Sequence, residues 1–152
     1  MENGDKTSIK LLSDALENHG FFSITNHGLS KDLINKCYES SKNFFDLDYA
    51  VQNSYSSVGS KGARGYTPKG IETAVGETIP DQKEFWHHGP VIDNSYDKKI
   101  PENIHIKEIP EFNKNFDDLY SELHQIGSRV LSVISLSLGL NQDYFNQWIK
   151  KG

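Results

Sequence analysis

The stretch that decides the fold is Gly20-Phe21-Phe22-Ser23-Ile24-Thr25-Asn26-His27-Gly28. Within it, Phe22 and Ile24 fall on one face of an extended backbone, because successive side chains of a strand point to opposite sides. Residues 21–25 are therefore predicted to form a strand that is buried on at least one face. The following Asn26-His27-Gly28 predicts a turn, in which His27 is a hydrogen-bonded structural residue rather than a catalytic base.

Helices are predicted on both sides of this strand. Apolar residues at helical spacing favour a first helix over residues 8–18, which Gly20 ends. They favour a second helix up to residue 45, for which Ser30 is the cap. A further short helix is expected over residues 46–53.

The middle of the chain, residues 54–110, is rich in glycine and proline. Glycine and proline at this density exclude long helices and strands. The aromatic residues in this segment nevertheless supply apolar area that can be buried. We expect an ordered, irregular segment with short strands near residues 65–68 and 84–87.

The longest predicted element follows Pro110, which suits the first turn of a helix. Apolar residues at three- and four-residue spacing predict one helix over residues 111–138, and a last short helix is expected after a cap at Asn141. Together these elements place the chain in the α+β class, mostly helical with a few short strands.

Composition narrows the range of partners and compartments. The 152 residues carry 16 Lys and Arg against 21 Asp and Glu, a net charge of -5, and no basic stripe that could neutralise phosphates. We therefore expect neither nucleic acid nor a membrane as partner, and the start of the chain has no signal-like pattern, so a cytoplasmic location is expected. The single cysteine, Cys37, is expected to be a packed apolar residue rather than a reactive thiol.

The sequence contains no self-contained catalytic or metal site. None of the six histidines is followed two positions later by Asp or Glu, so the His-x-carboxylate part of a facial iron triad is absent. His87 and His88 are adjacent, and adjacent side chains of a strand point to opposite faces, which makes a shared metal ion unfavourable. We predict no catalytic residue and no metal ligand in this chain.

Arg64 and Tyr66 are the candidate substrate-binding residues. Two glycines flank this segment and let a ligand approach the backbone, Arg64 can hold a carboxylate through two parallel hydrogen bonds, and Tyr66 combines an apolar ring with a polar tip. The alternative is structural: Arg64 pairs with one of the acidic residues and Tyr66 packs in the core.

The order and spacing of several segments resemble the N-terminal half of the isopenicillin N synthase-like family of Fe(II)/2-oxoglutarate-dependent oxygenases. The resemblance includes the opening stretch, the proline-introduced long helix, and three shorter motifs: Phe44-Phe45-Asp46-Leu47, Arg64-Gly65-Tyr66 and Asp81-Gln82-Lys83-Glu84-Phe85. It implies one N-terminal oxygenase-type domain over residues 1–152 that supports a double-stranded β-helix, or jelly roll, whose barrel core is largely absent from this chain.

The same resemblance implies a function. The intact enzyme is expected to use Fe(II), 2-oxoglutarate and O₂ to oxidise a small organic molecule, although some members use O₂ without 2-oxoglutarate. The iron and 2-oxoglutarate ligands would belong to a C-terminal catalytic half, so this chain alone is expected to be inactive and to bind neither. The resemblance also implies that Arg64 and Tyr66 lie near the substrate mouth.

A second hypothesis from a different class remains open. The chain could be a stand-alone binding or interaction module that has lost the catalytic barrel. A β-rich sequence after Gly152 with His-x-Asp, a distal His and Arg-x-Ser would favour the enzyme, and a stop codon would favour the module.

Overall fold

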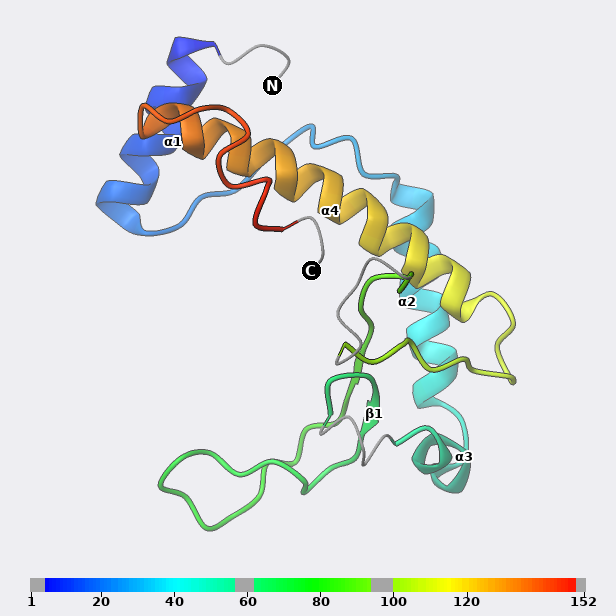
Figure 1. The fold of residues 1–152 in the computed structure, drawn as a ribbon. Helices are drawn as coiled ribbons and strands as arrows, with labels where there is room; N and C mark the ends of the chain where they lie inside the picture. Colours follow the sequence, from blue (N-terminus) through cyan, green and yellow to red (C-terminus); the bar gives the residue numbers. More distant parts are fainter. Residues whose placement is uncertain (1–4, 57–61, 94–99, 150–152) are drawn as a thin grey trace. The chain divides into compact units, whose positions relative to one another are not determined.

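The computed structural model describes residues 5–56, 62–93 and 100–149. Its elements follow the order α1 (Lys6–His19), α2 (Lys31–Phe45), α3 (Tyr49–Ser54), β1 (Gly65–Thr67), β2 (Phe85–His87) and α4 (Phe112–Ser137), shown in Figure 1. The α+β prediction, mostly helical with a few short strands, is confirmed. No helix in the described part of the chain is long and apolar enough to span a membrane.

The chain divides into two compact units, which we describe separately. The terminal unit comprises residues 1–29 and 121–152, and the central unit comprises residues 30–120, so α4 contributes to both. The expectation of a single N-terminal domain over residues 1–152 stays a prediction.

In the terminal unit, α1 begins at Lys6, two residues before the predicted start, and ends at the predicted glycine. The Asp5 carboxylate accepts a hydrogen bond from the Thr7 amide at 3.2 Å and caps the first turn. Gly20, at φ +76°, adopts the left-handed conformation that ends the helix, and its amide donates to the Leu16 carbonyl.

The strand predicted over residues 21–25 is wrong. The expected alternation is present, because Phe22 and Ile24 are half-buried while Phe21, Ser23 and Thr25 are exposed. A strand also needs a neighbour for its backbone groups, and the strands in the described residues, β1 and β2, pair with each other. The turn that follows is confirmed, with Asn26 at φ +54° and Gly28 at φ +85°.

The short helix expected after Asn141 is also wrong. Residues 142–148 form hydrogen-bonded turns, and residues 150–152 lie outside the described part of the chain. The Asn141 side chain does cap, since it accepts from the Asp143 amide at 3.0 Å. The Tyr144 and Trp148 amides, however, donate to carbonyls three residues back, so the consecutive bonds that propagate an α-helix do not form.

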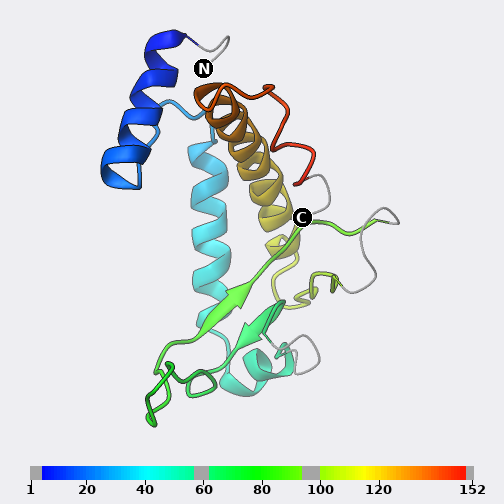
Figure 2. The ribbon, with the colours of Figure 1, turned by 60° about the vertical axis from the view of Figure 1, so that its left-hand side comes forward.

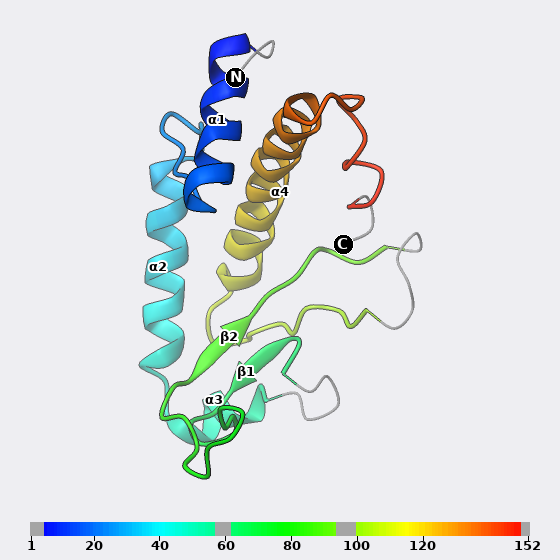
Figure 3. The same ribbon diagram turned by 90° about the vertical axis from the view of Figure 1, so that its left-hand side faces the viewer.

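The central unit holds the main core. The helix α2 is capped by Ser30, whose hydroxyl accepts from the Leu33 amide at 3.3 Å. The chain continues into α3, which contacts β1 (Figure 3). Both predicted strands are confirmed, and they form an antiparallel pair (Figure 2). Tyr66 lies opposite Trp86 in this pair.

Phe44, at the end of α2, is the centre of this core. Its side chain is 0% exposed. The centroid of its ring lies 5.0 to 6.3 Å from the centroids of five other rings, those of Phe45, Tyr55, Tyr66, Trp86 and Phe112. Edge and tilted contacts of this kind add to the free energy gained from burial alone. One helix, the strand pair and the start of α4 therefore share a single aromatic cluster.

Cys37 is buried in the same unit, as expected for a packed residue. Its sulfhydryl donates to the Asn115 carbonyl at 3.3 Å. Burial raises the pKa of this thiol, and the nearby Asp118 adds to the effect, so the reactive thiolate is disfavoured.

We predict that Phe44→Ala lowers the free energy of unfolding by about 3–5 kcal/mol, because it removes a fully buried ring and leaves a cavity. The matched control is Tyr38→Ala on the same helix, where the side chain is 73% exposed and the expected change is within about 0.5 kcal/mol. Urea denaturation followed by circular dichroism gives both values. Equal losses in the two variants would contradict the position of Phe44 at the centre of the core.

Candidate functional site

The Arg64 side chain lies against the backbone that follows β2. A Cβ atom added to Gly89 would lie 2.1 Å from Nη2 of Arg64 and 2.2 Å from its Cζ, so the guanidinium packs directly on the glycine. Arg64 is half-buried and Gly89 is buried. The Nη1 atom of Arg64 also donates to the Ala63 carbonyl at 2.6 Å. The guanidinium therefore has a defined position against the Gly89 backbone, just beyond the strand pair, which we call the guanidinium seat.

Tyr66 lies in the core rather than at the surface. Its side chain is 1% exposed, and its hydroxyl donates to the Glu84 carboxylate at 2.5 Å. Burial raises the pKa of Tyr66 above its ordinary value, and the bond to Glu84 adds to this. The same bond lowers the pKa of Glu84, with burial opposing it and Lys69, at 3.2 Å, adding to it. Substrate contact by Tyr66 stays a prediction, and this geometry favours a supporting role.

A buried polar network lies beside Gly89. Nε2 of His88 is 2.7 Å from an Asp117 carboxylate oxygen, and the His88 side chain is only 7% exposed. The Asn103 amide forms two bonds with Gly89: its oxygen accepts from the Gly89 N–H at 2.8 Å, and its nitrogen donates to the Gly89 carbonyl at 2.8 Å. The Asn103 nitrogen also lies 3.3 Å from the same Asp117 oxygen.

The network fixes the protonation of His88. Nε2 of His88 lies 2.7 Å from the Asp117 oxygen, which can only accept, and 3.1 Å from the Asn103 nitrogen. From the shorter contact we assign the proton of the neutral imidazole to Nε2, which leaves Nδ1 as a buried acceptor with no partner in the described residues. Burial lowers the pKa of His88 below the ordinary 6.5, the bond and charge of Asp117 oppose this, and the charges of Arg64 and His105 add to it. His88 is therefore neutral at pH 7.

The adjacent His87 has a different environment. It is exposed, and its Nδ1 atom bonds to the Gly62 carbonyl. The two neighbouring histidines thus have separate partners, as the strand geometry predicted. Within the described part of the chain, no group of three His, Cys, Asp or Glu side chains is arranged to hold a metal ion. These residues do not fit an iron centre.

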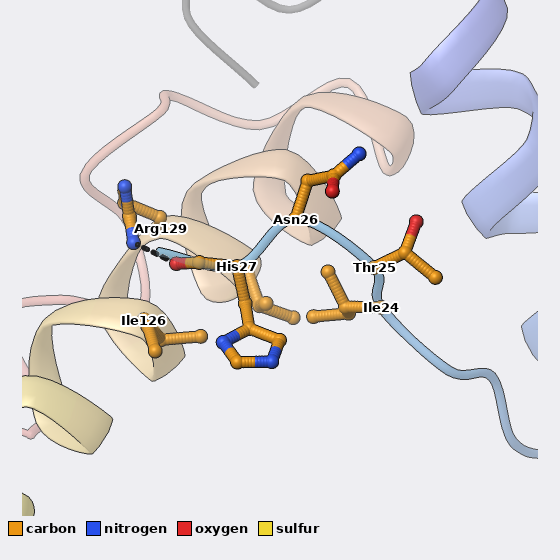
Figure 4. A pocket seen from close by; sticks show the side chains of 7 residues that line it. Ile24, Thr25, Asn26, His27, Ile126 and Arg129 are labelled. Carbon is orange, nitrogen blue, oxygen red and sulfur yellow. Dashed lines mark hydrogen bonds between the residues drawn. The ribbon is translucent and has the colours of Figure 1, made fainter. Parts of the chain in front are cut away.

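The terminal unit contains a small cavity, of about 80 Å³, around the predicted turn (Figure 4). The Arg129 guanidinium donates to the His27 carbonyl at 3.1 Å, and the Leu29 amide donates to Nδ1 of His27 at 3.1 Å. Both bonds hold the turn, which supports the structural role expected of His27. Ile24 and Ile126 contribute apolar walls.

Sequence reasoning missed most of the network around Arg64. It treated His88 only as a metal candidate, and it gave no role to Gly89, Asn103 or Asp117. These residues are 14 or more positions apart along the chain, so no local spacing connects them. The one available signal was a glycine placed just after a strand, which often marks a close approach of another group.

Comparison with known proteins identifies the family. The family model for the N-terminal region of "non-haem dioxygenase in morphine synthesis" matches residues 2–110. The chain belongs to this family. The resemblance to Fe(II)/2-oxoglutarate-dependent oxygenases is thereby confirmed, and the matched region is the N-terminal one.

Relatives of this family match nearly the whole chain. A 2-oxoglutarate-dependent dioxygenase of Didymella fabae is 27% identical over 139 residues, which cover 85% of this chain and 42% of that protein. The crystal structure of a 2OG-Fe(II) oxygenase family protein from Caulobacter crescentus is 33% identical with a TM-score of 0.81, covering 92% of this chain and 46% of that one. The structure of JOX2 in complex with 2OG, Fe and JA has a TM-score of 0.72 at 24% identity, which shows a shared fold, and covers 97% of this chain and 41% of that one. The chain spans less than half the length of these relatives.

The lowered pKa of His88 predicts a pH dependence of stability. The unfolded chain takes up a proton on His88 near pH 6.5, whereas the folded chain resists that proton until a lower pH. The contribution of neutral His88 is therefore complete above about pH 6.5 and is lost as the pH falls towards the lowered pKa.

Thermal melts between pH 7.5 and 5 test this prediction. His88→Gln should lose less stability on acidification than the unsubstituted protein, because one proton-linked group has been removed. Parallel pH profiles for the His88 variant and the unsubstituted protein would contradict the assignment of a neutral, buried imidazole.

Proposed function

We propose that the chain is the N-terminal part of a non-haem Fe(II)/2-oxoglutarate-dependent dioxygenase that oxidises a small organic molecule with O₂. The observation that carries the proposal is the family match over residues 2–110. It is supported by a relative whose name states dependence on 2-oxoglutarate and by a similar fold in a protein solved with 2OG and Fe. A cytoplasmic location, with neither nucleic acid nor membrane as partner, belongs to the same proposal and rests on the acidic composition.

In this proposal the iron ligands come from outside the chain. The described residues do not fit a metal centre, and the relatives are more than twice as long as the matched region. A C-terminal catalytic half would hold Fe(II) and 2-oxoglutarate and supply the oxidising chemistry. The residues of this chain would bind and orient the substrate and support that half.

Arg64 is the residue we assign to substrate binding. Of the two arginines, Arg64 is the one that lies beside the strand pair, with its guanidinium packed on Gly89. Arg64 presents a planar guanidinium at the strand pair, suited to a carboxylate or another anionic group. Tyr66 is the middle residue of β1, and the bond from its hydroxyl to Glu84 would help to hold the backbone next to Arg64 in place.

The terminal unit offers a surface for the catalytic half. Its exposed large apolar side chains include Phe21 at 75%, Leu138 at 60% and Trp148 at 70%, and burial of such side chains against a partner would be favourable. Phe21 also belongs to the extended segment whose backbone has no strand neighbour in the described residues. The same exposed residues are what a stand-alone interaction module would use, so the alternative remains and needs a test of its own.

We predict that the 152-residue chain binds no Fe(II) tightly, because its described residues lack a facial set of ligands. Anaerobic calorimetric titration with Fe(II) or Co(II) measures this. The control is a longer protein that includes the catalytic half, which should bind one metal ion. Sub-micromolar stoichiometric binding by the short chain, abolished by changing His87 or His88, would contradict the proposal, and absence of metal-dependent oxidation in the longer protein would favour the module.

We predict that Arg64→Ala in the full-length enzyme lowers kcat/KM by about 10- to 150-fold, equivalent to the roughly 1.5–3 kcal/mol of a hydrogen bond to a charged group. Steady-state kinetics of substrate oxidation measure this, and Arg64→Lys should recover only part of it, since a lysine cannot form the two-pronged contact. The affinity of Arg64→Ala for Fe(II) should stay unchanged. The matched control is Arg129→Ala, which removes the other arginine and should not lower kcat/KM in the same way. An unaltered kcat/KM would return Arg64 to a structural role.

A further inference from the structure

We propose that Gly89 and Asn103 are positioning residues that fix the Arg64 guanidinium in its binding orientation. The proposal rests on the substrate role assigned above to Arg64 and extends it to residues that do not themselves touch a ligand. It follows from three contacts: the guanidinium on Gly89, the paired bonds between Asn103 and Gly89, and the tie from Asn103 to Asp117 on α4.

The first contact explains why residue 89 is a glycine. Its backbone does not adopt the left-handed conformation, so the requirement is one of space. An added Cβ would lie 2.1, 2.2 and 2.5 Å from Nη2, Cζ and Nε of Arg64, far inside contact distance. Any side chain at this position therefore has to push the guanidinium away from its seat.

The second contact fixes the seat itself. Gly89 lies just beyond β2, where strand pairing has ended at His87. The Asn103 side chain takes over from the strand by bonding both the N–H and the carbonyl of Gly89, each at 2.8 Å. One amide side chain thus acts as a neighbouring strand would, and it holds the peptide on which Arg64 rests.

The third contact sets which way the Asn103 amide points. Its nitrogen lies 2.8 Å from the Gly89 carbonyl and 3.3 Å from the Asp117 carboxylate, and both of these groups can only accept. The Asn103 nitrogen also lies 3.1 Å from Nε2 of His88. A flipped amide would lose the bonds to both the N–H and the carbonyl of Gly89, so the observed orientation is the favourable one. Asp117 also holds His88, the residue before Gly89, and so anchors the seat to α4 at two points.

The charges around the seat agree with this role. His88 is neutral, so it does not place a second positive charge beside Arg64. An arginine that is already ordered loses less conformational entropy when it binds an anion than one that moves freely in solvent. The network therefore acts on affinity through the order of Arg64.

Nuclear magnetic resonance of the arginine side chains tests the proposal directly. The chain has two arginines, so the spectrum of Nε–Hε groups contains one signal for Arg64 and one for Arg129 as an internal reference. In the unsubstituted chain the Arg64 signal should have an order parameter near that of rigid backbone, about 0.85. In Gly89→Ala and in the milder Asn103→Ser it should fall below about 0.6, while the Arg129 signal is unchanged.

Two controls separate positioning from general loss of stability. Gly127→Ala adds a Cβ that meets nothing within 4 Å. Asn113→Ala removes another buried asparagine of the central unit, one whose side chain bonds the backbone of Ile104 and Ile106. Both should leave the Arg64 signal rigid. A mobile Arg64 in the unsubstituted chain, or equal effects of Asn103→Ser and Asn113→Ala, would overturn the proposal.

Kinetics of the full-length enzyme then separate this proposal from the substrate role of Arg64. Gly89→Ala should raise KM about as much as Arg64→Ala does, leave kcat nearly unchanged, and have no further effect when Arg64 is already alanine. Additive effects of the two substitutions would overturn the positioning role. Loss of Arg64 order with no change in KM in either variant would leave the positioning intact and overturn the substrate role.

Discussion

The burial of the Phe44 ring is the interaction on which the central unit depends. Strands of three residues cannot stand alone in water, because a two-stranded pair gains too little from its own contacts. Here Tyr66 and Trp86, which face each other across the pair, both pack on Phe44. The aromatic cluster therefore stabilises the strand pair, and the strand pair in turn carries Arg64 and Gly89.

The same cluster sets the start of α4. Phe112, 1% exposed, packs on Phe44 at the first position of the helix. From there one and a half turns of helix lead to Asp117, the residue that orients Asn103 and His88. A contact in the hydrophobic core thus determines where a polar network forms, and the network determines where the guanidinium rests.

Much of this architecture could be predicted from local patterns. Caps, glycine stops and helical spacing gave the helices α1, α2 and α4 within a few residues, because these signals act over one or two turns. The two failures, the strand at 21–25 and the helix after Asn141, share a cause. A local pattern shows what a segment can form, but a strand needs a neighbour and a short helix needs a packing surface, and neither requirement is written in the segment itself.

The candidate site was predictable only in part, for a related reason. Arg64 and Tyr66 attracted attention through their residue types and the flanking glycines, but Tyr66 proved to be a core residue. The sequence did not point to Gly89, Asn103 and Asp117, because these residues are far apart along the chain. They come together only when β2 and α4 have folded. Nonlocal hydrogen bonds of this kind have no sequence period.

In the proposed enzyme, the central unit and the catalytic half would have different tasks. An oxidising centre must be reached by O₂ and substrate, whereas a guanidinium that selects substrate benefits from being held in advance. The central unit would provide that rigidity through the two bonds between Asn103 and Gly89 and through the contacts of Asp117 with Asn103 and His88. The exposed, alternating segment 21–25 is the opposite case: its apolar face is half-buried but its backbone has no strand neighbour in the described residues. In our proposal, a strand of the catalytic half would pair with this backbone and cover Phe21, so this segment, rather than the Arg64 site, would make that contact.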